Sequence, residues 1–335
     1  MRIWVSGSLA YDIILDYQGK FADHIRPEKL HVISLSFLVR SVNKTIGGTA
    51  GNIAYSLAML GMKPCLLAAV GEDGKEMLGR YGKLGISVKN IRISRLPTAA
   101  AYIMTDSMDN QITGFHPGAM NEKIKLPKLK KNDWAIIAAE NPRNMAALAR
   151  HYQKNQIRYI FDPGQAITSL SKSQMRQCVS GAAIVIGNDY EIDNIFGKIK
   201  SPLPSPPPPD FAKATTGTRG EGNKNEFLPL EGGGKVGVVI IRTLGPKGSE
   251  IVCPNGKKIK IGVAQVKKSV DPTGAGDAYR AGLICGIMRG FDLKIAAQLG
   301  ATSAAFAVEH YGTQNHHFNY GILVKRHNKN FESRI

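Results

Sequence analysis

The sequence contains little cysteine, and its cysteines form no recognisable set. Four of them are spread over 335 residues without a C-x-x-C pair, namely Cys65, Cys178, Cys253 and Cys285. A zinc site built on paired cysteines and a disulfide framework are therefore excluded as organising features. A reducing compartment is the expected location.

Long apolar runs are also missing. No stretch approaches the roughly 18 apolar residues of a membrane-spanning helix, so no membrane partner is expected. The first residues, MRIWVSGSLAYDIILDY, reach serine, glycine and aspartate early and make a poor signal peptide. Together with the cysteine pattern, these absences predict a cytoplasmic protein.

Acidic residues are scarce relative to basic ones. The chain has 26 Asp and Glu against 44 Lys and Arg, a formal net charge of +18. A nucleic-acid surface would account for this excess, but the basic residues are spread along the chain without a recognition helix or zinc finger. A generally basic, solvated surface is favoured, and nucleic acid is not expected as a partner.

Two common nucleotide-binding signatures are lacking. The string nearest to a Walker A sequence, GGGKV at 232–236, has neither the spacing nor the Ser or Thr, and no G-x-G-x-x-G string follows a strand and opens a helix. P-loop and dinucleotide-binding folds are therefore disfavoured.

What the sequence does contain is an alternation of short apolar runs with helical patterns. The runs are aliphatic or β-branched and lead into Gly, Asp, Asn or Pro, as strands buried on both faces do. They cover 1–7, 63–71, 133–140, 157–164, 182–189 and 237–245, and helical patterns cover 52–61, 143–155, 278–290 and 292–310. We predict an α/β fold with a doubly wound, mostly parallel central sheet flanked by helices, which binds ligands beyond the carboxyl ends of its strands.

Three segments depart from this alternation. Residues 10–46 and 98–116 contain alternating stretches, among them SLSFLV at 34–39, that are typical of half-exposed antiparallel strands. We interpret them as a small β lid over the binding edge. Residues 198–235 are too rich in Pro and Gly to pack and are expected to form a flexible surface insertion.

The sequence DPTGAGDAYRAG at 271–282 carries the clearest chemistry. Gly274, Ala275 and Gly276 can bring backbone amides close to an anion, and the following helix adds its positive end. Asp277 in the first turn could accept a proton from a substrate hydroxyl. A bare Gly turn followed by a helix-capping Asp is the alternative interpretation.

The longer string DPTGAGDAYRAGLICG resembles the second signature of the ribokinase/PfkB family of ATP-dependent small-molecule kinases. Residues 47–91, beginning GGTAGNIAYSLAMLG, resemble the first signature. Within that family the chain is most similar to bacterial-type adenosine kinases, on segments at 6–12, 31–39, 115–120, 187–191, 243–248 and 311–314. The resemblance covers about 1–197 and 236–320, and implies a single ribokinase-like domain over 1–335.

The resemblance implies roles for particular residues. Asp277 would be the catalytic base, with Gly274, Ala275 and Gly276 forming the anion hole. The nucleoside would contact Ser8, Asp12, Ser36, Gly47, Gly48, Asn52, Tyr102, Phe115 and Gln165, and ATP would contact Thr243, Gly245 and Gly248. Asn188 and Glu191 would organise Mg²⁺ through water. Asp271 and Thr273 match positions of a monovalent-cation loop, which implies K⁺.

The implied reaction is phosphorylation of adenosine by ATP to give AMP and ADP. Ala166 stands where the family more often has a second Gln, and the tail 323–335 falls short of the usual final helix. Three alternatives stay open: another nucleoside, a sugar such as ribose, or a non-catalytic nucleic-acid-binding or regulatory protein on the same fold. Monomer and homodimer are both compatible with the sequence.

Overall fold

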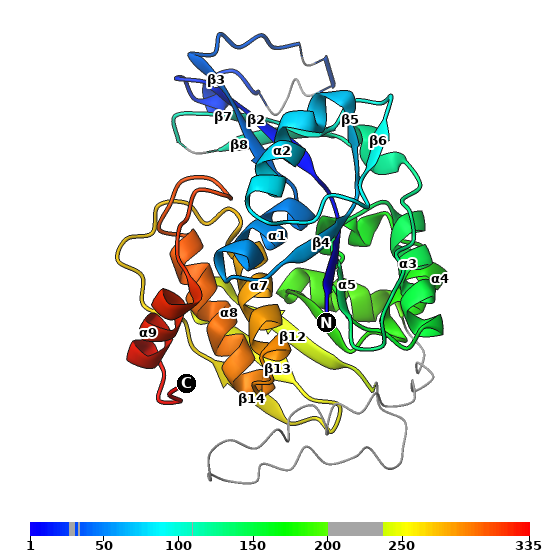
Figure 1. The fold of residues 1–335 in the computed structure, drawn as a ribbon. Coiled ribbons are helices and arrows are strands. Elements are labelled where there is room, and N and C mark those ends of the chain that lie inside the picture. Colours follow the sequence, from blue (N-terminus) through cyan, green and yellow to red (C-terminus); the bar gives the residue numbers. More distant parts are fainter. Residues whose placement is uncertain (27–30, 33, 109, 200–236) are drawn as a thin grey trace.

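The computed structural model describes residues 1–26, 31–32, 34–108, 110–199 and 237–335. Figure 1 shows a large sheet covered by helices and a smaller sheet that projects from one end of it. Of the stretch 198–235, which was expected to form a flexible insertion, residues 200–235 lie outside the described residues.

The large sheet has eight strands in the order β14-β13-β12-β11-β10-β9-β1-β4. Their bounds are β1 Ile3–Ser6, β4 Pro64–Leu67, β9 Trp134–Ile137, β10 Arg158–Phe161, β11 Ile184–Asn188, β12 Val239–Thr243, β13 Ser249–Val252 and β14 Lys258–Ile261. The six strands from β4 to β12 run parallel, and β13 and β14 extend the sheet as antiparallel neighbours. Each predicted apolar run contains one of the parallel strands, so the mostly parallel sheet is confirmed.

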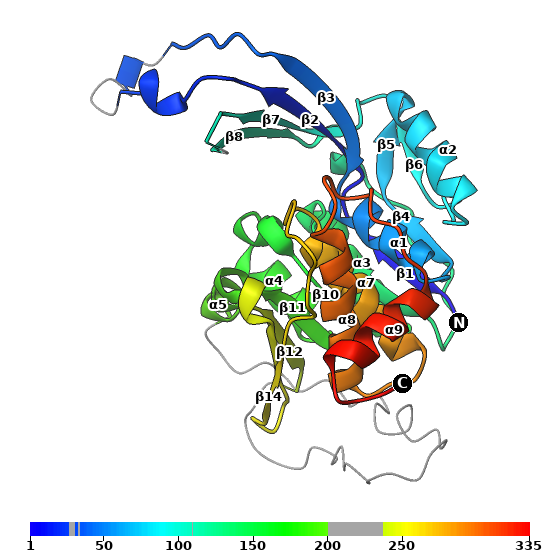
Figure 2. The ribbon, with the colours of Figure 1, turned by 90° about the vertical axis from the view of Figure 1, so that its left-hand side faces the viewer.

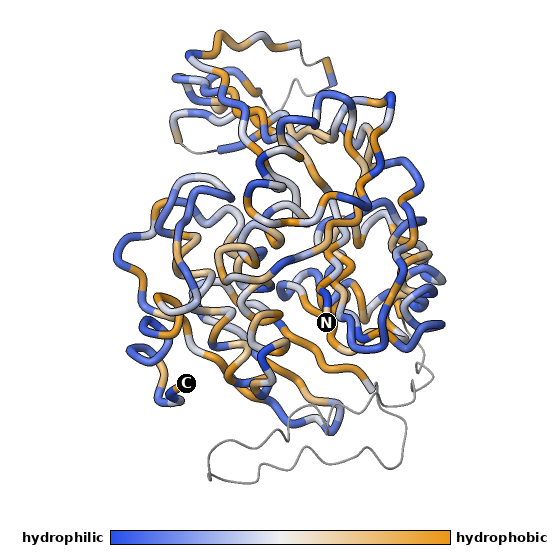
Figure 3. Tube along the Cα trace, in the orientation of Figure 1, coloured by the Kyte–Doolittle hydropathy of each residue, from blue (hydrophilic) through white to orange (hydrophobic). Residues whose placement is uncertain are grey.

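Helices cover both faces of this sheet (Figure 2). Their bounds are α1 Thr49–Met59, α2 Lys75–Lys83, α3 Pro142–Lys154, α4 Lys172–Val179, α5 Asp189–Lys198, α7 Ala275–Met288, α8 Leu293–Ala307 and α9 Tyr320–Asn330. In β1, Ile3 and Val5 join a core with α1, α7 and α8, whereas Trp4 joins a second core with α3, α4 and α5. Successive residues of a strand point to opposite faces, so one strand contributes side chains to two apolar layers. Figure 3 shows the strands as apolar tracts between more polar helices.

The small sheet has four strands in the order β3-β2-β7-β8. Their bounds are β2 Ala10–Asp16, β3 Ser41–Gly47, β7 Ala99–Thr105 and β8 Gln111–His116. The β2–β3 and β7–β8 pairs are antiparallel as expected, but the central β2–β7 pair is parallel, which corrects the all-antiparallel prediction. Residues 34–39, expected as a strand, form none.

Two further regions complete the fold. A two-stranded parallel sheet, β5 Ala69–Gly71 with β6 Arg92–Ser94, stands beside α2. The C-terminal tail, expected to fall short of the family's usual final helix, includes most of α9, which starts at Tyr320. Asn319 caps this helix by accepting a hydrogen bond from the amide of Ile322 at 2.9 Å. That cap gives the short tail a defined helix start.

Candidate active site

The turn before α7 brings backbone amides and a carboxylate to the carboxyl edge of the large sheet. Gly274 is the N-cap of α7 and has φ of 79°, a left-handed backbone that favours glycine. The Ala275 amide closes the turn by donating to the Pro272 carbonyl at 3.2 Å. Among the described residues, no carbonyl accepts from the amides of Gly276 or Asp277. Two open amides and the positive helix end therefore face one position.

The surroundings of Asp277 favour the protonated, neutral form of its carboxyl group. Burial raises the pKa of Asp277 to about 7, and the negative charges of Asp162 and Asp12 act in the same direction. Arg280 and a hydrogen bond from Asn52 Nδ2, 2.8 Å from Asp277 Oδ2, oppose that rise. A carboxylate with a pKa near the working pH is suited to general base catalysis.

The amide of Asn52 is held in one orientation. Gln314 Nε2 donates to Asn52 Oδ1 at 3.0 Å and to the Tyr81 hydroxyl at 3.1 Å, so the Asn52 nitrogen is the atom that faces Asp277. Sequence reasoning did not identify Gln314 or Tyr81 as site residues. The only available signal was the string YGTQ at 311–314.

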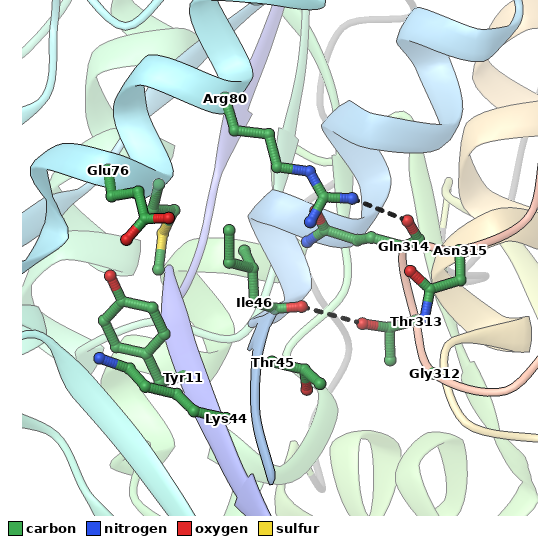
Figure 4. Close-up of a pocket in the computed structure, with 11 residues that line it drawn as sticks. Tyr11, Lys44, Thr45, Ile46, Glu76, Arg80, Gly312, Thr313, Gln314 and Asn315 are labelled. Atoms are coloured by element: carbon green, nitrogen blue, oxygen red, sulfur yellow. Dashed lines mark hydrogen bonds between the residues drawn. The ribbon is translucent and has the colours of Figure 1, made fainter.

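Gln314 also borders a cavity of about 330 Å³ between the small sheet, α2 and the 312–315 loop. Figure 4 shows Tyr11, Lys44, Glu76 and Arg80 around this space, with Arg80 donating to the Gln314 carbonyl at 3.0 Å. Tyr11 precedes Asp12 on β2, so its side chain projects to the opposite face of the small sheet. Thr45, the direct partner of Asp12, and Thr313 also line this cavity.

Asp12 projects from β2 towards Asp277, and two glycines make room beside it. Burial raises the pKa of Asp12 to about 6. A Cβ at Gly47 would collide with the Asp12 carboxylate. Gly48 caps α1 with φ of 87°, and a Cβ there would lie 2.5 Å from the Ser8 carbonyl oxygen. Ser8 is buried, and its Oγ accepts from the Thr49 amide at 3.1 Å.

A buried ion pair lies beneath the anion turn. Arg280 of α7 donates through Nε and Nη2 to the two carboxylate oxygens of Asp162, which follows β10. Sequence reasoning did not identify either residue. The available signals were an aspartate directly after a buried strand and a single arginine within a small-residue helix.

Asn188 and Glu191 lie together at the start of α5, at the end of β11. The Glu191 amide donates to Asn188 Oδ1 at 2.9 Å, and the Asn188 amide donates to Glu191 Oε2 at 2.8 Å. This is a capping box, the structural role weighed against metal binding for these residues. Glu191 Oε1 makes no hydrogen bond within the described chain, and one carboxylate oxygen fits a Mg²⁺ ion that keeps most of its waters.

The residues predicted for ATP lie at the end of β12 and in the turn after it. Thr243 Oγ1 donates to the Gly187 carbonyl at 3.3 Å. Gly245 and Gly248 have φ of 56° and 87°, and a Cβ on Gly248 would collide with the Ile261 carbonyl. These glycines shape a tight turn beside the Asn188 end of β11, to which β12 pairs.

Asp271 joins two loops next to the anion turn. Its Oδ1 accepts from the Thr273 amide at 2.8 Å, and its Oδ2 accepts from the Gly312 amide at 2.9 Å. The structure thus brings Asp271 and Thr273 together, and their role towards K⁺ stays a prediction.

The register of the small sheet separates two aromatic residues that the sequence placed together. Directly paired residues project to the same face. Asp12 pairs with Ala101, and Ala101 pairs with Phe115, so half-exposed Phe115 shares the face of Asp12. Tyr102 is one residue further along and projects to the opposite face. The structure therefore does not bring Tyr102 to the candidate site.

Two other predicted contacts lie on the surface. Ser36 is exposed in the segment before β3 and, within the described chain, makes no hydrogen bond to the other candidate residues. Gln165 is exposed in the short helix Gly164–Thr168, and only its carbonyl is engaged, by Thr168 Oγ1 at 3.3 Å. Their contacts with a nucleoside stay predictions.

Two further features are missing from the described residues. Among the described residues, no group of three or more His, Cys, Asp and Glu side chains is arranged to hold a metal ion. None of the helices in the described ranges is both long and apolar enough to cross a membrane.

The chain is similar to known kinases over most of its length. Residues 11–318 match the pfkB family carbohydrate kinase. A nucleoside kinase from Methanothermobacter thermautotrophicus is 30% identical over 299 residues, which cover 87% of each chain.

Two solved structures show the same arrangement. The Burkholderia thailandensis nucleoside kinase, solved with inosine, superimposes with a TM-score of 0.77 at 30% identity and covers 99% of each chain. The Methanocaldococcus jannaschii nucleoside kinase superimposes with a TM-score of 0.78 at 26% identity, covering 98% of this chain and 99% of its own. The predicted ribokinase-like α/β fold is thereby confirmed.

Proposed function

Because this chain belongs to the pfkB family of carbohydrate kinases, we propose that it transfers the γ-phosphoryl group of ATP to the 5′-hydroxyl of a purine nucleoside. The products are the nucleoside 5′-monophosphate and ADP. The observation that carries the proposal is Asp277, which has a pKa near 7 and lies in the same helical turn as two open backbone amides. A base and an anion hole at one point are what phosphoryl transfer to a hydroxyl requires.

Asp277 acts in its ionised form. Its Oδ1 is not engaged by Asn52, which donates to Oδ2, and so can accept the hydrogen bond of the 5′-hydroxyl. As the bond between the hydroxyl oxygen and the γ-phosphorus forms and the bond to ADP breaks, the hydroxyl proton passes to Asp277. The amides of Gly276 and Asp277 stabilise charge on the transferring group. Most of the rate enhancement comes from positioning and electrostatics.

The nucleoside lies between the large sheet and the small sheet. Asp12 accepts hydrogen bonds from two ribose hydroxyls, a task suited to an ionised carboxylate. Gly47 and Gly48 allow the ribose to approach the backbone, and the small sheet closes over it as a lid. Phe115, on the face of Asp12, supplies an aromatic surface for the base.

ATP lies along the strand ends near Thr243 and Gly248. The support for a nucleotide is the Burkholderia thailandensis kinase, which was also solved with ADP and inosine. Glu191, together with Asn188, would hold Mg²⁺ through water, and the ion would supply positive charge to neutralise the phosphates. Asp271 and Thr273 shape the loop for a monovalent cation next to the anion turn.

Adenosine is the first candidate acceptor, from the sequence resemblance. Inosine is the second, because it is the nucleoside bound in the Burkholderia thailandensis structure. Ala166 favours relaxed selectivity, since alanine provides no hydrogen bond to distinguish an amino group from a carbonyl on the purine.

The test is chromatographic detection of monophosphates from MgATP with adenosine, inosine, guanosine and ribose, each run in parallel with Asp277→Asn. We expect a purine nucleoside to be the fastest acceptor. The Asn variant should lose at least about 10³-fold in turnover while binding the nucleoside normally, because Asn cannot accept the proton. Preference for ribose would overturn the nucleoside assignment, and full activity of Asp277→Asn would overturn the role of the base.

A further inference from the structure

Arg280 reaches back to the start of α7. It lies one turn after Asp277, and long helical side chains point towards the N-terminus of their helix. Its Nε and Nη2 donate to the two oxygens of Asp162, with 2.6 Å between Nη2 and Asp162 Oδ1. The side chains of Arg280 and Asp162 are only 9% and 4% exposed. This bidentate contact fixes the plane of the guanidinium group and leaves its third nitrogen, Nη1, unused.

Nη1 is directed at the anion turn. No described residue accepts a hydrogen bond from it, and it lies next to Gly276, where a Cβ would be 2.7 Å away. Gly276 is inside α7 and is not among the glycines with positive φ, so backbone freedom does not explain a glycine there. The need for space beside Arg280 Nη1 explains the glycine at this position. Gly276 is also the anion-hole residue whose amide is open.

A buried ion pair is weak evidence of a role in stability. A buried ion pair costs desolvation energy, and well-packed apolar residues in its place are commonly as stable or more stable. Arg280 also lies near two further carboxylates, those of Asp277 and Glu191. Burial raises the pKa values of both groups, and the positive charge of Arg280 lowers them. A cation held among the base, the metal-binding candidate and the open amides is positioned for a charged ligand.

We propose that Arg280 is a further catalytic residue, whose Nη1 donates a hydrogen bond to the phosphoryl group during transfer, and that Asp162 is the residue that positions it. The inference rests on the proposed phosphoryl transfer at Asp277. Arg280 keeps its protons throughout, so the bonds made and broken are those already described. Its contribution is a fixed positive charge beside the developing charge, where one donor is worth roughly 10²-fold in rate.

Two variants separate this role from a structural one. Arg280→Lys keeps the charge and can pair with Asp162, but its single nitrogen cannot serve both Asp162 and the phosphoryl group. The double variant Arg280→Gln with Asp162→Asn removes both charges at nearly constant volume, so that no buried charge is left unpaired. We expect both to fold and to lose about 10²-fold in kcat, with the KM for the nucleoside within about twofold of wild type.

A binding measurement gives a readout that packing alone would not change. Wild-type protein should bind MgADP with aluminium fluoride, a mimic of the phosphoryl group in transit, more tightly than MgADP alone. Both variants should lose that difference while retaining affinity for MgADP. If the double variant is as stable as wild type and keeps kcat within about threefold, Arg280 is not catalytic. If wild type phosphorylates none of the acceptors, the proposed function fails instead.

Discussion

The carboxylates of Asp12 and Asp277 border the proposed nucleoside site, and burial raises the pKa of both. With pKa values raised to about 6 and about 7, the two groups ionise within the range in which an enzyme is readily assayed. The proposed reaction requires both groups in the ionised form, Asp277 to accept a proton and Asp12 to accept hydrogen bonds.

We therefore predict that kcat/KM for the nucleoside, at saturating MgATP, rises from pH 5 and levels off above about pH 7. Below about pH 6 the logarithm should rise with a slope greater than 1, because two protons must be lost. Initial rates in overlapping buffers would measure this. The residual rate of Asp277→Asn should lack the upper step, and a wild-type profile flat from pH 5 to 8 would contradict the assigned base.

Glu140, three residues after the end of β9, supports a second prediction at the residue scale. It is buried, its Oε1 accepts from the Asn141 amide at 2.9 Å, and no described group pairs with its Oε2. Burial raises the pKa of Glu140 to about 8. The folded protein therefore holds this proton more tightly than the unfolded chain does, and stability is lost as the pH rises from about 4.5 to about 8.

Glu140→Gln removes that dependence while keeping the shape. We predict that the variant, compared with wild type, gains about 2–3 kcal/mol in free energy of unfolding between pH 5 and pH 8. Urea denaturation at the two pH values provides the measurement. A difference between the two proteins that does not change with pH would show that Glu140 is ionised in the folded state throughout.

At the residue scale, sequence patterns predicted the groups that belong to continuous motifs. Asp277 follows a glycine-rich turn, and Asn188 ends an apolar strand, and both patterns are visible in the sequence. Gln314 and Arg280 were missed because their roles depend on partners 262 and 118 positions away, at Asn52 and Asp162. The faces of Tyr102 and Phe115 depend on register, which alternation within one strand does not determine.

At the scale of elements, two adjacent glycines join β3 to α1: Gly47 ends the strand and Gly48 caps the helix. Gly48 has φ of 87° and ψ of 141°, a conformation open almost only to glycine, and its missing Cβ leaves space for the Ser8 carbonyl. This junction connects the small sheet to the large one. It sets the position of Asp12 relative to Asp277.

We predict that Gly48→Ala destabilises the protein by about 1–3 kcal/mol and weakens nucleoside binding at least tenfold. Gly61→Ala is the matched control, because Gly61 also has positive φ, 75°, but a Cβ there would meet nothing within 4 Å. Calorimetry gives both quantities, and hydrogen exchange should show nucleoside-dependent protection of β2 and β3 in wild type. Equal losses of nucleoside affinity in the two variants would contradict a special role of the junction.

At the element scale, the buried strands were predicted well because burial on both faces leaves a continuous apolar run. The parallel pairing of β2 with β7 was not predictable from local pattern, since alternation indicates exposure of one face and not strand direction. The segment 34–39 alternates like a strand but pairs with no strand among the described residues. Alternation within a segment does not show whether another strand is positioned to pair with it.

At the scale of the whole molecule, the net charge of +18 should attract a substrate that carries negative charge. MgATP is an anion and a nucleoside is neutral, so long-range attraction should assist only the nucleotide. We predict that kcat/KM for ATP falls about threefold or more as salt rises from roughly 20 to 200 mM, while the nucleoside KM stays constant. Parallel changes in both constants would contradict electrostatic steering. Tight, salt-sensitive DNA binding without turnover would favour the nucleic-acid alternative.

The pairing of β2 with β7 also constrains the order in which the chain can assemble. β2 and β3 form one antiparallel pair, and an isolated two-stranded pair is marginal in water. The partner that would stabilise it, β7, begins at Ala99, about ninety positions after the start of β2, so closing that contact costs chain entropy. During synthesis, the N-terminal strands must therefore wait until β7 has left the ribosome. Mutations that weaken β7 should therefore slow the folding of β2 and β3, although these strands lie far from β7 in the sequence.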